Sequence, residues 1–268
     1  MIIIGERINA TRKTIARAIE KRDAAFIKKE AEKQRLAGAH YLDLNAGLGK
    51  GTEKEDLGWL IHTVQEQDQG PLTLDSSDPA VLAECLPLVE NPEVMINSIN
   101  GEEKRIKGLL PVLKNHPQVK LIALTMDDSG IPQTAEKRIQ VADQLIKLVT
   151  AETNLPVENI YVDCLVQPIS VDTRNGLVFL DAMKELKRLY PGVKTTCGLS
   201  NVSFGLPERK KINQYFLVVS LAHGLDSAII DPTLPEMQEA VCLSQTVLGQ
   251  DEYCLNYLRF ARAVSGKG

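Results

Sequence analysis

The chain of 268 residues lacks several features that define other classes of protein. Its five cysteines include no CxxC pair and are odd in number, so the sequence predicts neither a disulfide framework nor a zinc ribbon. No apolar run approaches the ~20 residues of a membrane-spanning helix. Residues 1–5 also lack the basic start and the apolar length of a signal peptide. We therefore expect a soluble, cytoplasmic protein with no membrane partner.

Clustered basic charge is also scarce. The formal net charge is −4, and the basic clusters at residues 28–29 and 209–211 are short. Because a general nucleic-acid binder needs clustered Lys and Arg to contact phosphates, no nucleic-acid partner is expected. A Gly/Ser-rich linker or Pro-rich hinge is missing as well, and the 44% apolar content can form one large core. The sequence therefore predicts a single domain.

Short apolar runs recur along the chain and predict buried strands. There are eight of them, at residues 2–4, 41–44, 72–74, 94–96, 121–124, 160–162, 193–199 and 228–230. Segments with helical spacing of apolar residues lie between several of these runs, at residues 57–64, 106–113, 141–149 and 212–221. Eight alternations of strand and helix favour a parallel sheet, and eight is the number of strands that closes into a barrel.

Helix boundaries are marked independently of the apolar pattern. Thr52 with Glu55 predicts a capping box, Asp78 before a proline predicts an N-cap, and Gly38 and Gly224 stand where helix C-caps are expected. The predicted fold class is α/β, a (β/α)8 TIM barrel over residues 1–263 with a polar tail at residues 264–268. A doubly wound open sheet is the alternative, but residues 5–9 read GERIN and not GxGxxG.

Polar side chains stand where the predicted strands end. In a TIM barrel the active site is built at the carboxyl ends of the strands. An unpaired polar group buried there costs about 1 to 3 kcal/mol, so partners are expected. Helix capping is an equal explanation for any single Asp or Asn. For the whole set, a ligand whose edge alternates hydrogen-bond donors and acceptors is the better one. The set is Glu6, Arg7, Asn9, Asp43, Asn45, Asp75, Asn97, Asp163, Ser200, Asn201 and Asp231.

Seven short strings resemble, in the same order, the pterin-binding methyltransferase family. That family includes the folate domain of cobalamin-dependent methionine synthase and the methyltetrahydrofolate:corrinoid protein methyltransferases. The resemblance covers essentially the whole chain. Its most informative string is GLSNVSFGLP at residues 198–207; the others are GERIN at 5–9, DLN at 43–45, LDS at 74–76, MINS at 95–98, YVD at 161–163 and GLD at 224–226, continuing to Asp231.

The resemblance implies an enzyme that moves a methyl group between N5 of tetrahydrofolate and the cobalt of a corrinoid. The implied pterin and folate contacts fall on Asp75, Asn97, Asp163, Gly198, Ser200, Asn201 and Arg209. Further candidates at the strand ends and beside Asn201 are Glu6, Asn9, Asp43, Asn45, Phe204 and Asp231. Phe204 departs from relatives that carry a polar residue at this position, and it can stack but not hydrogen-bond through its side chain.

Asn201 matches the residue that the family uses for catalysis. A tertiary amine is a poor leaving group, so demethylation needs a hydrogen bond or positive charge at N5, and the amide of Asn201 is the implied donor. The proton itself is expected from solvent. The alternative for Asn201 is a turn residue in the left-handed conformation. Arg209 is expected to contact the folate tail or to help position Asn201.

The resemblance also implies partners. No Asp-x-His-x-x-Gly string occurs, so cobalamin is expected to arrive on a separate corrinoid protein, with tetrahydrofolate or 5-methyltetrahydrofolate as the substrate. The family is usually homodimeric, and a homodimer is expected here. No bound metal is expected, because the four histidines are scattered and Cys164 and Cys197 lack an adjacent cysteine pair, which favours buried small side chains.

Three other functions remain open at this point. A dihydropteroate synthase shares the pterin barrel but needs cations at the ends of the seventh and eighth strands, which read LSNV at 199–202 and IDPT at 230–233. A non-catalytic pterin or corrinoid-protein binding subunit is disfavoured by the donor at Asn201. A Schiff-base aldolase is disfavoured because Lys194 stands at the start of its strand.

Overall fold

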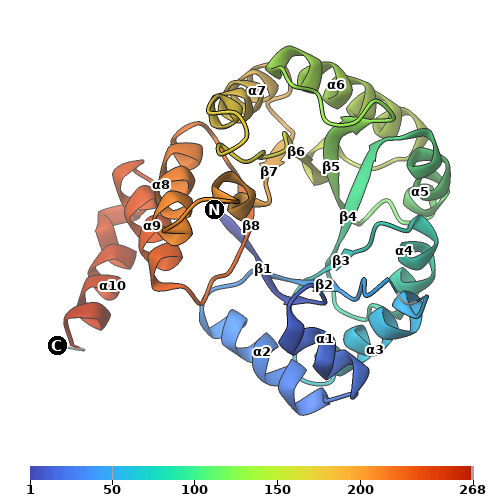
Figure 1. Cartoon of the computed structure of the whole chain (residues 1–268), viewed down its shortest axis with the longest axis horizontal. Helices are drawn as coiled ribbons and strands as arrows, with labels where there is room; N and C mark the ends of the chain where they lie inside the picture. Colours follow the sequence, from blue (N-terminus) through green and yellow to red (C-terminus); the bar gives the residue numbers. More distant parts are fainter. Residues whose placement is uncertain (50, 267–268) are drawn as a thin grey trace.

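The computed structural model describes residues 1–49 and 51–266, which form a barrel of eight parallel strands surrounded by helices (Figure 1). The predicted (β/α)8 TIM barrel is thus confirmed. The strands are β1 (Ile2–Asn9), β2 (Tyr41–Asn45), β3 (Leu72–Asp75), β4 (Val94–Gly101), β5 (Lys120–Asp127), β6 (Ile160–Asp163), β7 (Lys194–Thr196) and β8 (Ser227–Ile230).

The helices lie outside the strands as a ring, except that α10 projects beyond the ring from its contact with α9 (Figure 1). Their bounds are α1 (Lys13–Glu20), α2 (Ala24–Leu36), α3 (Glu53–Gln65), α4 (Pro79–Cys85), α5 (Glu103–Asn115), α6 (Ala135–Glu152), α7 (Asn175–Leu189), α8 (Arg209–Ala222), α9 (Pro235–Val247) and α10 (Leu255–Ser265). Four short 3-10 helices also occur: η1 (Leu86–Leu88), η2 (Val157–Asn159), η3 (Leu199–Ser203) and η4 (Glu252–Cys254).

The sheet closes between β7 and β8. Consecutive strands pair side by side from β1 to β7, and β8 pairs with β1. Between β7 and β8 the Ile229 N–H donates to the Cys197 carbonyl at 2.9 Å, and the Ser227 hydroxyl donates to the Thr195 carbonyl at 3.1 Å. These bonds close the barrel, so the open-sheet alternative is wrong.

The interior of the barrel is apolar at one end only. Side chains alternate along a strand, so Tyr41, Asp43 and Asn45 share the inner face of β2. Tyr41 belongs to a small apolar cluster inside the barrel, whereas the main core lies between the outer strand faces and the helices. Beyond the cluster the inner face turns polar, as Asp43 and Asn45 show. The carboxyl end of the barrel is therefore left for a polar ligand.

The helix-boundary predictions are confirmed at three of four places. Asp78 accepts a hydrogen bond from the Ala80 N–H at 2.9 Å as the N-cap of α4, and Gly38 and Gly224 have the positive φ angles of 93° and 98° that favour glycine. The capping box is wrong, because the Thr52 hydroxyl donates to Asp56 at 2.7 Å and does not cap the backbone of α3.

Three strands extend well beyond the predicted apolar runs. β1, β4 and β5 each have eight residues, because their polar ends continue to pair with neighbours, as Asn9 does with Asn45 and Gly101 with Asp127. β7 is shorter than expected, since the chain turns into η3 after Gly198. Helix α10 continues to Ser265, two residues into the expected polar tail, of which residues 267–268 lie outside the described part. No described helix is long and apolar enough to span a membrane.

Candidate active site

A cavity of about 460 Å³ lies at the carboxyl ends of the strands. It brings together residues from five strands and from η3, far apart in the sequence. Eight predicted site residues line it, namely Glu6, Asn9, Asp43, Asp75, Asn97, Gly198, Ser200 and Asn201, together with Thr11, Arg12 and Ile229. The predicted convergence of polar strand ends is therefore present for these eight.

The register of the sheet places Asn45, Asp75 and Asn97 next to one another on β2, β3 and β4. The Asn45 amide donates to Asp75 Oδ2 at 3.0 Å, so Asn45 holds the carboxylate from the side and does not itself line the cavity. Burial raises the pKa of Asp75 to about 6, although the Asn45 bond and the charge of Arg105 oppose the shift. Asp75 is therefore ionised at neutral pH, where it can accept hydrogen bonds, and its carboxylate gains a proton in mild acid.

Asp43 lies deeper, with only 1% of its surface exposed. Its pKa is raised by burial and by the nearby charge of Asp75, against a hydrogen bond from Asn97. Asp43 Oδ1 has no hydrogen-bond partner within the described chain. A buried polar atom without a partner is uncommon in folded proteins, and here it fits a ligand that brings its own polar groups to the cavity.

Asp163 does not line the cavity, contrary to the expectation that it opens onto the same space as Asp75, Asn97 and Asn201. Its carboxylate is drawn toward the backbone instead, accepting from the Leu165 N–H at 2.7 Å and the Gly198 N–H at 3.3 Å. Burial raises its pKa to about 6 despite these bonds. Asp163 thus lies behind the cavity wall that Gly198 forms.

Asn201 lies on η3, exposed and facing the cavity. Its φ angle is not positive, so the left-handed turn alternative is wrong. The side-chain amide has no hydrogen-bond partner among the described residues. A Cβ at Gly198 would lie 3.4 Å from Asn201 Nδ2, so a glycine at that position leaves room around the amide. The donor is available to a ligand.

Arg209 and Phe204 lie outside the cavity. The Arg209 guanidinium donates to the Ser200 carbonyl at 2.7 Å and to the Ser203 hydroxyl at 3.0 Å, and it stacks over the Phe204 ring at 5.8 Å. Phe204 is 62% exposed. In this geometry Arg209 braces the segment that carries Asn201, which is one of the two roles expected for it.

Asp231 is held away from the cavity by Arg7. The Arg7 guanidinium donates to Asp231 at 2.9 Å and to Glu30 at 2.6 Å. Burial acts to raise the pKa of Asp231, but the bonds from Thr233 and the charge of Arg7 outweigh it and lower the pKa. Asp231 is therefore a structural anion at this end of the barrel.

Arg12 lines the cavity but was not among the predicted site residues. Its guanidinium lies 3.2 Å from Glu6 Oε1, and burial raises the pKa of Glu6 against the charge of Arg12. Arg12 comes three residues after Asn9, in the turn that follows β1. Its position in a turn after a barrel strand was the available signal, because such turns form the active-site face.

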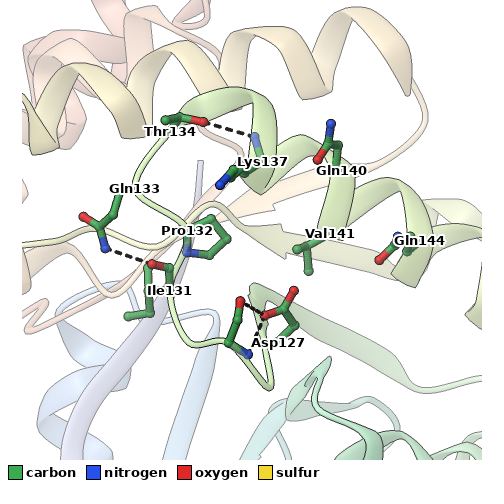
Figure 2. Close-up of a pocket in the computed structure, with 10 residues that line it drawn as sticks. Asp127, Ile131, Pro132, Gln133, Thr134, Lys137, Gln140, Val141 and Gln144 are labelled. Carbon is green, nitrogen blue, oxygen red and sulfur yellow. Dashed lines mark hydrogen bonds between the residues drawn. The ribbon is translucent and has the colours of Figure 1, made fainter.

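A second cavity, of about 440 Å³, lies between the β5–α6 turn and the first turns of α6 (Figure 2). Several of its polar groups bond locally: the Ser129 hydroxyl donates to Asp127 at 2.5 Å, the Gln133 amide donates to the Ile131 carbonyl at 2.9 Å, and Thr134 caps α6 (Figure 2). The cavity inside the barrel is the better candidate for a polar ligand, because polar residues from several strand ends converge there and the buried Asp43 Oδ1 has no partner in the described chain.

The cysteines after strands six and seven and Lys194 lie where they were expected. Cys164 and Cys197 are buried, and burial raises the pKa of both thiols. Lys194 is the first residue of β7, at the amino end of the barrel and away from the cavity. Among the residues that the structure describes, no cluster of His, Cys, Asp and Glu is arranged to hold a metal ion.

Together, the closed barrel and its cavity of carboxylates and amides define a binding protein for a small, polar, donor-rich ring. The chain belongs to the family of pterin binding enzymes, whose model matches residues 5–231.

The chain is 38% identical to a methylcorrinoid:tetrahydrofolate methyltransferase from Eubacterium limosum, over 98% of this chain and 96% of that protein. It is 32% identical to the methionine synthase of Mycobacterium leprae over 91% of this chain, which spans only 22% of that longer protein. Among solved structures, a dihydropteroate synthase from Stenotrophomonas maltophilia superposes with a TM-score of 0.70 at 17% identity, covering 92% of each chain. That likeness shows the shared fold.

Proposed function

We propose that this protein is a methyltransferase that moves a methyl group between N5 of tetrahydrofolate and the cobalt of a corrinoid carried on a separate protein. The observation that carries the proposal is the meeting of Asp75, Asn97 and Asn201, from three separate strand ends, in one cavity. The name of the Eubacterium limosum relative, which covers nearly the whole chain, describes the same transfer.

The acidic side of the cavity suits the aminopyrimidinone edge of a pterin. That edge presents neighbouring N–H donors, and a carboxylate can accept two of them in parallel. Asp75 is the proposed acceptor, with Asn97 beside it in the sheet as a group that both donates and accepts. The Asp163 carboxylate accepts from the Gly198 N–H, so Asp163 is proposed to support pterin binding from behind the cavity wall that Gly198 forms.

Asn201 is the proposed catalytic residue. In transfer to tetrahydrofolate, the N5 lone pair attacks the methyl carbon, the carbon–cobalt bond breaks, and both of its electrons stay on cobalt, which becomes cobalt(I). The N5 proton then leaves to solvent. In the reverse direction cobalt(I) attacks the methyl group of protonated N5. Because N5 keeps its hydrogen while its lone pair bonds the methyl carbon, the amide oxygen of Asn201 is the proposed acceptor from N5–H. This hydrogen bond is stronger at the partly positive N5 of the transition state than at neutral N5, so it lowers the barrier more than it tightens binding of the neutral folate.

The proposed partner is a corrinoid protein that docks over the carboxyl face of the barrel. The cavity opens at that face, and the chain has no Asp-x-His-x-x-Gly string of its own for a corrinoid. We extend the direction in the relative's name, from methylcorrinoid to tetrahydrofolate, to this chain. The same residues must also serve the reverse transfer, because both directions share one transition state.

We further propose a cytoplasmic homodimer. An apolar groove of about 460 Å³ runs between α7 and α8, and Leu177 and Tyr215 on its walls are 61% and 72% exposed. Apolar patches of this kind on a folded surface mark protein contacts. A second copy of the chain is the occupant we propose.

The function is tested by mixing the protein anaerobically with tetrahydrofolate and methylcob(III)alamin and following the cobalt(I) absorbance. We expect protein-dependent formation of cobalt(I) with one 5-methyltetrahydrofolate per cobalt. Pterin binding without transfer, both here and with methylated corrinoid proteins, would identify a non-catalytic binding subunit. Condensation of a pterin pyrophosphate with an aryl amine would identify a dihydropteroate synthase.

A further inference from the structure

Two buried arginines flank the candidate site without a direct ion pair; the nearby charges of Asp75, Glu102, Asp78 and Glu53 act on Arg105 from a distance. Arg105 is 6% exposed and Arg138 is 0% exposed. Neither forms a salt bridge with any residue in the described chain. Buried arginines are normally paired with a carboxylate, because a charge removed from water is costly. These two charges therefore need an explanation.

Arg105, on α5, is bound by three backbone carbonyls. Its Nε donates to the Ser98 carbonyl at 2.6 Å, its Nη2 donates to the Ser76 carbonyl at 2.6 Å, and its Nη1 donates to the Ser77 carbonyl. Ser76 directly follows Asp75, and Ser98 directly follows Asn97. One guanidinium thus ties together the ends of the two strands that carry the proposed pterin contacts.

Arg138, on the first turn of α6, the next helix around the barrel, is bound in the same way. Its Nη1 donates to the carbonyls of Cys164 at 2.7 Å and Leu165 at 2.6 Å, and its Nε donates to the Pro132 carbonyl at 2.9 Å. Leu165 has a φ of 60°, in the left-handed region that a leucine rarely adopts. Its N–H donates to Asp163. Arg138 therefore holds the turn that orients Asp163.

We propose that Arg105 and Arg138 are a matched pair of positioning residues, each of which fixes the backbone just after one site carboxylate and keeps that carboxylate ionised from a distance. A direct salt bridge would occupy carboxylate oxygens that a pterin needs. A guanidinium bound to carbonyls supplies the charge without an ion pair, which leaves Asp75 able to accept from a pterin and Asp163 able to accept from the Leu165 and Gly198 N–H groups. This inference rests on the proposed function.

The electrostatic arrangement supports the pairing. Burial raises the pKa of both carboxyls to about 6, while Arg105 acts to lower the pKa of Asp75 and Arg138 acts to lower that of Asp163. Other ionisable groups act on the pair from the neighbouring elements. Glu53 and Asp43 interact with Asp75, and the thiols of Cys164 and Cys197 interact with Asp163. The two arginines are the positive charges that reach these carboxyls.

Arg35 is the matched control. It binds the carbonyls of Ala39 at 3.1 Å, His40 at 2.6 Å and Pro71 at 2.8 Å, but it also forms a salt bridge with Asp68 at 2.8 Å. Its carbonyl partners lie just before β2 and β3, at the amino end of the barrel. It makes the same kind of backbone contact without a site carboxylate nearby.

The first test uses the ligand-free protein with ¹³C-labelled aspartate, titrated by NMR. In Arg105→Met we expect the titration midpoint of Asp75 to move to higher pH while that of Asp163 is unchanged. In Arg138→Met we expect the midpoint of Asp163 to move to higher pH while that of Asp75 is unchanged. Arg35→Met should move neither. If a Met variant does not fold, the corresponding Gln variant, which retains an amide donor to the carbonyls, is titrated in the same way. Unmoved midpoints in variants that fold would overturn the inference.

The second test measures tetrahydrofolate affinity by calorimetry at about pH 6 and about pH 8. For Arg105→Met the loss of tetrahydrofolate affinity at the lower pH should exceed the loss at the higher pH by about fivefold, the effect of raising the pKa of a required carboxylate from about 6 by about one unit. Arg105→Lys keeps the charge but cannot reach three carbonyls, so its loss of tetrahydrofolate affinity should be similar at the two pH values. Equal losses in the Met variant would reduce Arg105 to a purely structural residue. Failure of the wild-type protein to bind tetrahydrofolate would refute the proposed function, while the NMR titration would still decide the electrostatic role.

Discussion

Replacing Asn201 with alanine isolates the proposed catalytic hydrogen bond. The side chain lies exposed on η3 and has no hydrogen-bond partner in the described protein. Its removal therefore leaves no buried group unsatisfied, and the free energy of unfolding should change by less than about 0.5 kcal/mol. Any larger effect on methyl transfer then reflects the reaction and not the fold.

The expected magnitude follows from what the amide does in the mechanism. A single hydrogen bond to a centre where charge develops contributes about 10²-fold in rate, or about 2.7 kcal/mol. The pterin edge is held by Asp75 and Asn97, which stay in place, so tetrahydrofolate affinity should fall by less than about fivefold. The partner protein binds its corrinoid itself, so its affinity for the mutant should be unchanged.

The assay is single-turnover stopped flow at saturating tetrahydrofolate, following cobalt(I) absorbance, with affinity measured in parallel by calorimetry. Asn115→Ala serves as the control, since Asn115 is an exposed asparagine at the end of α5 near the amino end of the barrel. Equal losses of rate and affinity would make Asn201 a general binding residue. A wild-type rate would remove it from the mechanism.

Three further outcomes are expected. Asp75→Ala should weaken tetrahydrofolate binding by about 2 to 4 kcal/mol in calorimetry, because it truncates a charged partner; unchanged affinity would leave Asp75 a capping role. Tetrahydrofolate affinity should fall as the pH drops through about 6, where Asp75 and Asp163 gain protons. The free energy of unfolding should receive the opposite contribution, because both pKa values exceed the unfolded value of 3.8 and the folded state binds more protons in that range. A pH-independent affinity would contradict the assignment. Sedimentation should give twice the 29.5 kDa of the chain, and Tyr215→Asp, in the groove between α7 and α8, should shift it toward monomer; a wild-type monomer would reject the dimer.

The eight-stranded barrel and most of its cavity could be predicted from local sequence patterns. Buried parallel strands read as short apolar runs, so the first polar residue after each run marks the carboxyl end. Consecutive strands are neighbours in this fold, which is why Asn45, Asp75 and Asn97 were expected together and are adjacent in the register. These inferences need only the spacing of residues along each strand.

Side-chain direction was beyond the reach of the same patterns. Asp163 ends a strand like Asp75, but the left-handed turn at Leu165 directs an N–H onto its carboxylate and draws it behind the wall. Asp231 directly follows β8, and its carboxylate accepts a hydrogen bond from Arg7 of β1, a contact between residues 224 positions apart. Where a polar group can choose between the backbone, a distant cation and a ligand, only the three-dimensional structure decides.

The two buried arginines show a signal that periodicity does contain. Arg105 stands four residues before Leu109 and eight before Leu113, and Arg138 stands three before Val141 and seven before Leu145. Both are therefore in phase with the buried face of their helices, where a charged residue is normally absent. Both also lie in the first turn of a helix that follows a barrel strand, beside the carboxyl ends where ligands bind. In this chain a basic residue in phase with the apolar stripe at that turn therefore marks a charge beside the site, and the pH titrations of the Arg105 and Arg138 variants test whether that charge acts on the site carboxylates.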